Sequence, residues 1–168
     1  MKWKIHEMDV ETTFLNGVVE EEVYVEQPLV FETHDRESHV CRLKKALYGL
    51  KQAPRTWYDR IDSFLSSLGF TKSKVDSNPY YKMEGGNPVT LLLYVDDLFV
   101  TCMDGLIVDT KRKLVAEFEM KNLGMMHYFL GMELWQSTYG IFLGQGNVGD
   151  IYHHIHSFGQ IGLVKPLS

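Results

Sequence analysis

The sequence predicts an α+β fold in which helices pack on one face of an antiparallel sheet. Three observations indicate it: short apolar strands bounded by turn residues, two amphipathic helices, and the order in which these elements alternate. The order is strands, helix, strand hairpin, helix and strand hairpin, which suits a sheet covered by helices on one side. The 168 residues are enough to enclose one hydrophobic core.

The predicted strands are short and are bounded by glycine, asparagine and proline. Asn16-Gly17 marks a turn, Pro28 stops a strand, and the segment 85–88 (Gly-Gly-Asn-Pro) separates two others. The expected strands cover residues 4–10, 23–25, 40–43, 79–83, 89–95 and 98–101. A closing hairpin is expected from residues 128–135 and 140–143.

Two segments have the 3.6-residue periodicity of amphipathic helices. In residues 54–68 the apolar side chains share one face, Pro54 suits the first turn, and Gly69 suits a left-handed cap. In residues 104–118, Asp104 is the expected N-cap. The inward face of this second helix is expected to carry Ile107, Lys111, Leu114, Val115 and Phe118.

Composition favours an intracellular, soluble protein with no membrane contact. No apolar run reaches the roughly 18 residues of a membrane span, and the N-terminus lacks the apolar core of a signal peptide. Cys41 and Cys102 are expected to be reduced, buried thiols. The histidines of segment 153–156 have no spaced carboxylate or cysteine to complete a zinc set.

The net charge of −5 argues mildly against nucleic-acid binding, but the charges are unevenly distributed. Residues 7–26 contain seven acidic side chains and no lysine or arginine, whereas residues 42–60 contain six basic side chains and one acidic. Two interpretations stay open. In the first, the two stretches form solvated faces of opposite charge. In the second, the acidic stretch contains a metal site and the basic stretch forms a surface that binds the phosphates of a nucleic acid.

Three carboxylates are the most informative candidates for chemistry. Asp96 and Asp97 stand between two apolar strands, and Asp9 lies near the end of the first strand. An Asp-Asp pair alone is also compatible with a polar hairpin turn. With Asp9 beside it, the set suits two Mg²⁺ ions, which prefer oxygen ligands. Two such ions about 3.5–4 Å apart are used for in-line nucleotidyl transfer.

Four blocks of the sequence resemble copia-type retrotransposon reverse transcriptases, which are RNA-dependent DNA polymerases. Residues 94–97 (YVDD) resemble the Tyr-x-Asp-Asp signature, and residues 8–17 (MDVETTFLNG) resemble the first-aspartate motif. Residues 43–58 (LKKALYGLKQAPRTWY) and 123–133 (LGMMHYFLGME) also match, in the same order, from about residue 3 to 145. The resemblance implies a palm-like antiparallel sheet that binds a template-primer and deoxynucleoside triphosphates.

The resemblance also implies roles for single residues. Asp9, Asp96 and Asp97 would be the catalytic ligands of two Mg²⁺ ions, with the Val10 carbonyl as an added ligand. Nucleotide binding would involve the backbone of Thr12 and Thr13, the steric-gate ring of Phe14, and the segment that contains Tyr48 and Gly49. Tyr48 stands where retroviral relatives carry glutamine. Tyr94 would lie beside the template-primer, and residues 129–135 resemble the primer-grip hairpin.

The pattern ends near residue 145, so we expect a partial palm-like domain over residues 1–145 and a divergent tail over residues 146–168. Most of the family's fingers region, and its thumb, RNase H and integrase regions, are expected to be missing. Two hypotheses therefore remain open: a copia-type polymerase fragment, or a non-catalytic remnant of a decayed retroelement. A two-metal nuclease is a third interpretation, which the spacing of Phe14 from Asp9 and the block 48–58 disfavour. The oligomeric state is not predicted.

Overall fold

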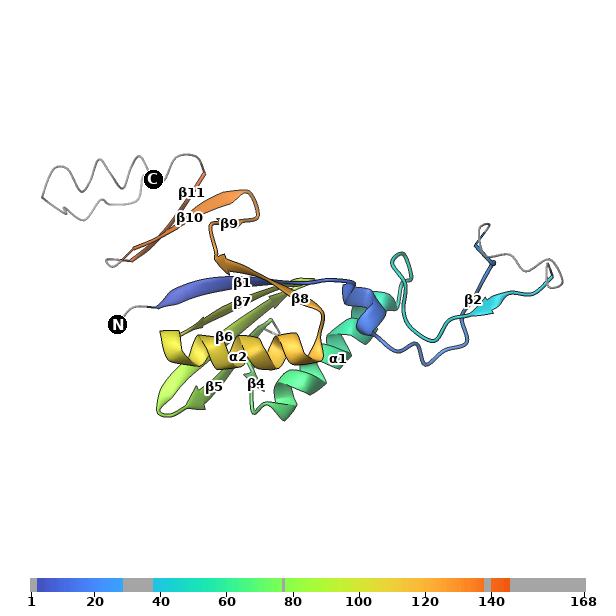
Figure 1. Ribbon diagram of the computed structural model, residues 1–168, viewed down its shortest axis with the longest axis horizontal. Helices are drawn as coiled ribbons and strands as arrows, with labels where there is room; N and C mark the ends of the chain where they lie inside the picture. The colour runs from blue at the N-terminus through green and yellow to red at the C-terminus, as the bar shows by residue number, and fades with distance from the viewer. Residues whose placement is uncertain (1–2, 29–37, 77, 138–139, 146–168) are drawn as a thin grey trace, which may run out of the picture.

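The computed structural model describes residues 3–28, 38–76, 78–137 and 140–145. Its centre is a six-stranded antiparallel sheet in the order β4-β5-β6-β7-β1-β8 (Figure 1). The strands are β1 (Lys4–Val10), β4 (Thr71–Lys72), β5 (Pro79–Glu84), β6 (Asn87–Tyr94), β7 (Asp97–Cys102) and β8 (Met120–Met125). Helices α1 (Ala53–Ser67) and α2 (Asp104–Glu117) pack on one side of this sheet. The predicted α+β class is confirmed.

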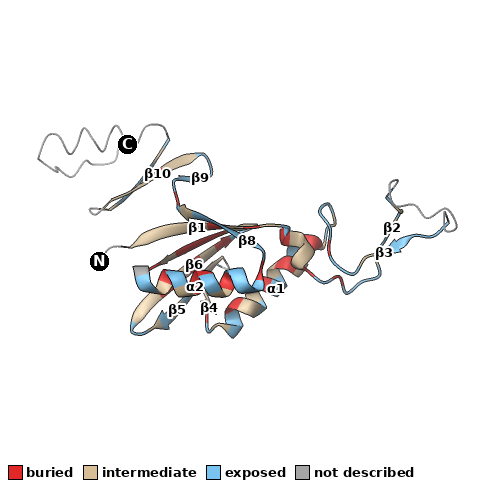
Figure 2. Ribbon diagram, in the orientation of Figure 1, coloured by how far each residue is buried: buried red, intermediate tan, exposed pale blue. Residues whose placement is uncertain are grey.

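The main core lies between the sheet and the two helices. Met8 and Val10 of β1 are buried there with Trp57, Ile61 and Leu65 of α1, as the alternation of strands and the period of helices require. Figure 2 shows buried residues on the sides of the helices that meet the sheet. We call the opposite side of the sheet its helix-free face.

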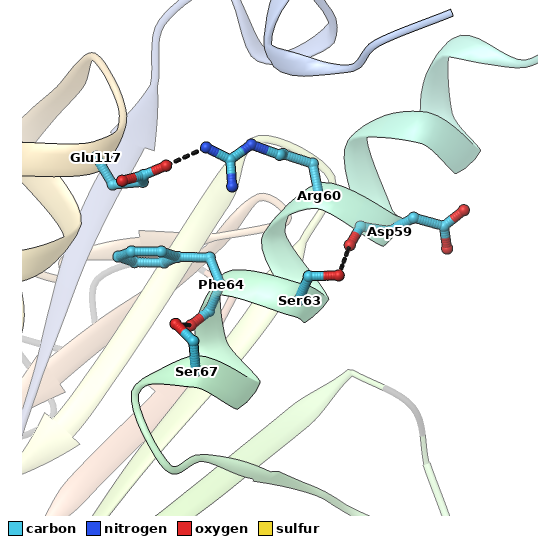
Figure 3. A network of polar contacts seen from close by, with 6 residues as sticks. All are labelled: Asp59, Arg60, Ser63, Phe64, Ser67 and Glu117. Atoms are coloured by element: carbon cyan, nitrogen blue, oxygen red, sulfur yellow. Dashed lines mark hydrogen bonds and ion pairs between the residues drawn. The ribbon is translucent and has the colours of Figure 1, made fainter. Parts of the chain in front are cut away.

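Polar contacts connect the two helices at their outer edge (Figure 3). Arg60 of α1 pairs with Glu117 at the end of α2, and its guanidinium lies 5.4 Å from the centre of the Phe118 ring. Two serines of α1 donate to backbone carbonyls in their own helix, Ser63 to Asp59 at 2.8 Å and Ser67 to Phe64. The Arg60–Glu117 pair thus links the two helices that contact the same sheet.

A smaller three-stranded sheet packs against the helix-free face. It consists of β9 (Tyr128–Phe129), β10 (Met132–Gln136) and β11 (Ile141–Gly144), in the order β11-β10-β9. The Gln136 side chain accepts from the Ile5 amide at 2.7 Å and donates to the Ile5 carbonyl at 2.9 Å. These two bonds attach the smaller sheet to β1.

A two-stranded ribbon extends away from the main sheet (Figure 1). It pairs β2 (Tyr24–Val25) with β3 (Cys41–Arg42), and a 3₁₀ helix η1 (Thr13–Asn16) connects β1 to it. Gly17, directly after η1, lies against the first turn of α1. A Cβ at Gly17 would lie 2.4 Å from Thr56 Oγ1, so glycine is required by close approach.

Several predictions about single residues were wrong. Cys41 is exposed because the ribbon has no core of its own, whereas Cys102 is buried as expected. The N-cap of α2 is Met103, and Asp104 is the first helical residue. Val115 is 48% exposed, because the helix turns it away from the sheet. Asn16-Gly17, by contrast, lies at a turn as predicted, because the Gly17 amide donates to the Phe14 carbonyl at the end of the 3₁₀ helix.

Both helix ranges and most strand ranges were predicted correctly. Gly69 follows α1 with φ +82°, the left-handed conformation expected of it. Strands β4 and β8 were not predicted. Within the described residues, no helix has the length and apolar character that crossing a membrane requires.

Candidate functional site

Two of the predicted carboxylates lie on neighbouring strands. Asp9 of β1 is the direct partner of Asp97 of β7 in the antiparallel register. Residues directly opposite in such a pair have Cβ atoms about 4.5–5.5 Å apart. Met8 and Val10 face the helices, so alternation places Asp9 on the helix-free face. Asp97 precedes Leu98, which also faces the helices, so both carboxylates project from the same face.

The third carboxylate, Asp96, lies in the tight turn between β6 and β7. Tyr94 pairs with Asp97, so Val95 and Asp96 form a two-residue turn. The Asp96 carbonyl accepts a hydrogen bond from the Val10 amide at 3.0 Å. This bond brings the turn to the end of β1, next to Asp9. The pairing of β1 with the β6–β7 hairpin thus brings together residues that are almost ninety positions apart in the sequence.

Electrostatics identify a fourth acidic member of the site. Burial, followed by the charges of Asp96, Glu7 and Asp9, raises the pKa of Asp97 from 3.8 to about 6. Burial and the charge of Asp9 also raise the pKa of Glu7, while His127 opposes the rise. We call Glu7, Asp9, Asp96 and Asp97 the carboxylate cluster. The prediction missed Glu7, although its place two residues before Asp9 on the same strand face was a usable signal.

The cluster has the donor chemistry of a site for hard cations, because every side-chain donor is a carboxylate oxygen. A divalent cation would offset the repulsion that, after burial, contributes to the raised pKa of Asp97. Among the described residues, however, no three His, Cys, Asp or Glu side chains converge closely enough to hold an ion. The Val10 carbonyl, predicted as an added ligand, accepts the Thr13 hydroxyl at 2.7 Å.

The residues predicted to bind a nucleotide follow the cluster along η1. Thr12 has φ +53°, and its neighbour Thr13 is fully buried. The Phe14 ring packs edge-on against Tyr48, with ring centres 4.6 Å apart. Gly49 follows Tyr48 with φ +90°. The structure therefore brings the two predicted segments, 12–14 and 48–49, into contact.

Aromatic rings connect the turn to the smaller sheet. Phe129 of β9 lies edge-on to Tyr94, with centres 5.9 Å apart, and to Phe99, with centres 5.1 Å apart. A cavity of about 240 Å³ lies between the two sheets and is lined by apolar side chains, including Leu92 and Leu134. The predicted primer-grip segment therefore lies beside Tyr94, which is 41% exposed.

The two charged stretches meet at the ribbon. Glu22 pairs with Arg42 at 3.2 Å across β2 and β3, so some of their charge is neutralised locally. The other basic side chains of residues 42–55 are exposed: Lys44, Lys45, Lys51 and Arg55. The histidines of segment 153–156 and the predicted tail lie outside the described residues.

The structure thus defines an α+β domain with acidic side chains on the helix-free face of an antiparallel sheet and an exposed basic stretch in residues 42–55. The family model described as "Reverse transcriptase (RNA-dependent DNA polymerase)" matches residues 1–160. The chain therefore belongs to the reverse transcriptase family, and the resemblance to copia-type elements is confirmed.

Transposon proteins of plants and yeast are similar to the chain. "Retrovirus-related Pol polyprotein from transposon TNT 1-94" of Nicotiana tabacum is 45% identical over 133 residues, covering 78% of this chain and 10% of the relative. "Retrovirus-related Pol polyprotein from transposon RE1" of Arabidopsis thaliana is 40% identical over 144 residues, covering 85% and 10%. "Putative transposon Ty5-1 protein YCL074W" of Saccharomyces cerevisiae is 37% identical over 134 residues, covering 79% and 44%. No solved structure matches the chain.

The chain spans about a tenth of the length of the two plant relatives. The family is shown by the match over residues 1–160, whereas the activity of this segment is a separate question.

Proposed function

We propose that the chain carries the palm-like catalytic centre of an RNA-directed DNA polymerase, with residues 1–145 as the palm-like part. The observation that carries this proposal is the register of β1 and β7, which sets Asp9 opposite Asp97 beside the Asp96 turn. The three aspartates of the first-aspartate block and the YVDD block are thereby brought to one end of one sheet. Residues 146–168 are proposed to be a divergent tail.

Asp9, Asp96 and Asp97 would hold two Mg²⁺ ions, which supply activation of a primer 3′-hydroxyl and support of the leaving pyrophosphate. The chain's own contribution is to concentrate negative charge where these cations are needed. The raised pKa of Asp97 keeps its carboxyl protonated below about pH 6 in the absence of a cation. Cation affinity is therefore expected to fall as the pH drops below that value.

The Phe14–Tyr48 contact supports a role in deoxynucleotide selection. An edge-on contact 4.6 Å between ring centres restrains the Phe14 side chain, which follows Asp9 by five residues. If a nucleotide binds at the carboxylate cluster, a restrained Phe14 ring would exclude a sugar that carries a 2′-hydroxyl. The backbone of Thr12 and Thr13 would lie next to the triphosphate in the same site. Gly49 would leave room for the nucleotide beside Tyr48.

The proposed nucleic-acid surface combines the exposed basic residues of segment 42–55 with the exposed ring of Tyr94, which packs against Phe129. Basic side chains follow phosphates, and exposed rings stack on bases. The local excess of positive charge offsets the acidic net charge of the whole chain. A template-primer and deoxynucleoside triphosphates are the partners proposed.

Primer extension on an RNA template with Mg²⁺ tests the proposal. We expect weak template-dependent DNA synthesis from this chain alone. The Asp96→Asn variant is expected to reduce it by a factor of at least about 100, since it removes a charged metal ligand. Asp59→Asn, an exposed change on α1, is the matched control and should retain synthesis. Synthesis that persists in Asp96→Asn would contradict the assigned site. A folded chain without synthesis would favour the non-catalytic remnant.

A further inference from the structure

The turn that carries Asp96 has a backbone conformation unfavourable for its sequence. Val95, the first central residue of this two-residue turn, has φ +55°. Turns with positive φ at that position normally use glycine, because a Cβ is strained there. Valine is among the least suitable residues, since its branched side chain crowds the backbone. Contacts from outside the turn must therefore stabilise this conformation of Val95.

Two neighbouring elements supply such contacts, one to each carbonyl of the turn. The indole Nε1 of Trp57 donates to the Val95 carbonyl at 2.8 Å, from a helix 38 positions away in the sequence. The Val10 amide donates to the Asp96 carbonyl at 3.0 Å. The peptide planes on both sides of Asp96 are thereby fixed, which sets the directions of the Asp96 and Asp97 side chains.

The position of Trp57 is itself tightly constrained. Its side chain is only 2% exposed, and its ring packs edge-on against Phe118 with centres 5.3 Å apart. A rigid indole has one N–H to donate, and here that N–H points at the strained residue. Phenylalanine would keep an aromatic ring in this core, although its smaller volume would fill the space less completely. The hydrogen bond is what phenylalanine would lack.

We infer that Trp57 is a positioning residue that holds the Val95–Asp96 turn in its left-handed conformation and so aligns the carboxylate cluster for divalent cations. Trp57 acts through the Val95 carbonyl and is assigned no contact with a substrate. The part of this inference that concerns cations rests on the proposed function. The part that concerns the turn conformation does not.

Nuclear magnetic resonance on the wild-type chain gives the first test. At positive φ an amide proton lies close to the Hα of its own residue, so Val95 should show a strong intraresidue cross-peak. The Trp57 indole proton should exchange slowly with solvent. Absence of either signal overturns the inference, whatever the variants do.

The variant test uses Trp57→Phe, which keeps a ring and removes the donor. We expect this variant to lose the Val95 cross-peak and to bind Mn²⁺ about tenfold more weakly, as for other residues that orient metal ligands. Mn²⁺, which prefers the same oxygen ligands, is measured by electron paramagnetic resonance. Trp3→Phe, outside the main core, is the matched control and should change neither signal.

Rescue separates positioning from general damage. Val95→Gly removes the strain, so adding it to Trp57→Phe should restore most of the Mn²⁺ affinity. A Trp57→Phe variant that retains the cross-peak, or that loses it without weaker Mn²⁺ binding, overturns the inference. So does failure of Val95→Gly to rescue. If the wild-type chain binds no Mn²⁺, the proposed metal centre fails, and the Val95 cross-peak in Trp57→Phe alone decides the conformational role.

Discussion

Replacing Asp97 with asparagine is expected to stabilise the fold above about pH 6 and to leave it unchanged below pH 3.8. The folded-state pKa of Asp97 is raised, so the unfolded chain releases this proton more readily than the folded chain. The favourable contribution of the protonated carboxyl is complete below pH 3.8 and is lost as the pH rises to about 6. The asparagine side chain of the Asp97→Asn variant cannot ionise and therefore avoids that loss.

The structure sets the size of the effect. A rise in the pKa of Asp97 from 3.8 to about 6 changes the free energy of unfolding by at most about 3 kcal/mol. Asp97 is only half-buried, so water screens much of the repulsion from Glu7, Asp9 and Asp96. We therefore expect a gain of about 1 kcal/mol at neutral pH.

Urea unfolding followed by circular dichroism across this pH range measures the effect. Asp59→Asn, on the exposed side of α1, is the control and should follow the wild-type curve at all pH values. Mg²⁺ at ten times its dissociation constant should stabilise the wild-type chain by about 1.4 kcal/mol. It should stabilise Asp97→Asn less. Parallel pH curves for wild type and Asp97→Asn would refute the electrostatic account of the cluster.

Two further substitutions test contacts that other elements make with helix α1. Gly17→Ala is expected to cost about 1–3 kcal/mol, because the new Cβ would lie 2.4 Å from Thr56 Oγ1 and force η1 away from α1. Tyr80→Phe is expected to cost about 1–2 kcal/mol, because the buried hydroxyl donates to Asp62 at 2.7 Å. Urea unfolding at neutral pH measures both.

Each of these substitutions has a matched control. Gly105→Ala, where a Cβ meets nothing within 4 Å, should stabilise α2 slightly, because alanine favours helices. Tyr81→Phe, on a residue 48% exposed, should change stability little. A Gly17→Ala variant as stable as wild type would contradict the close approach of η1 and α1. A similar cost for Tyr80→Phe and Tyr81→Phe would contradict the assigned hydrogen bond.

Local patterns predicted the elements whose stability depends on one buried face. The period of residues 54–68 gives α1 because Trp57, Ile61 and Leu65 face a common core. Strand β8 was missed because its sequence, MKNLGM, has little strand propensity. It forms because β1 offers an open edge, and its pairing is irregular between Glu7 and Met8. Such non-local pairing overrides local preference.

The site shows the same division between local and non-local information. Asp9, Asp96 and Asp97 could be named from motifs, and their strand-end positions suggested that they meet. The conformation of Val95 could not be predicted, because turn rules favour glycine or asparagine there. Its support comes from Trp57, and nothing in either local sequence indicates that bond. The role of Trp57 in packing was predictable, whereas the role of its indole N–H was not.

Fold stability and the proposed cation binding favour different side chains on the helix-free face. Four acidic residues lie close to one another on this face, and burial together with their mutual repulsion raises the pKa values of Glu7 and Asp97. Stability alone would favour neutral side chains at these positions, and Val95 adds strain to the same turn. At the proposed site, a bound divalent cation would offset the repulsion, because it reverses the electrostatic sign between the carboxylates. The Mg²⁺ dependence of unfolding therefore separates a working cation site from a remnant that keeps only the fold.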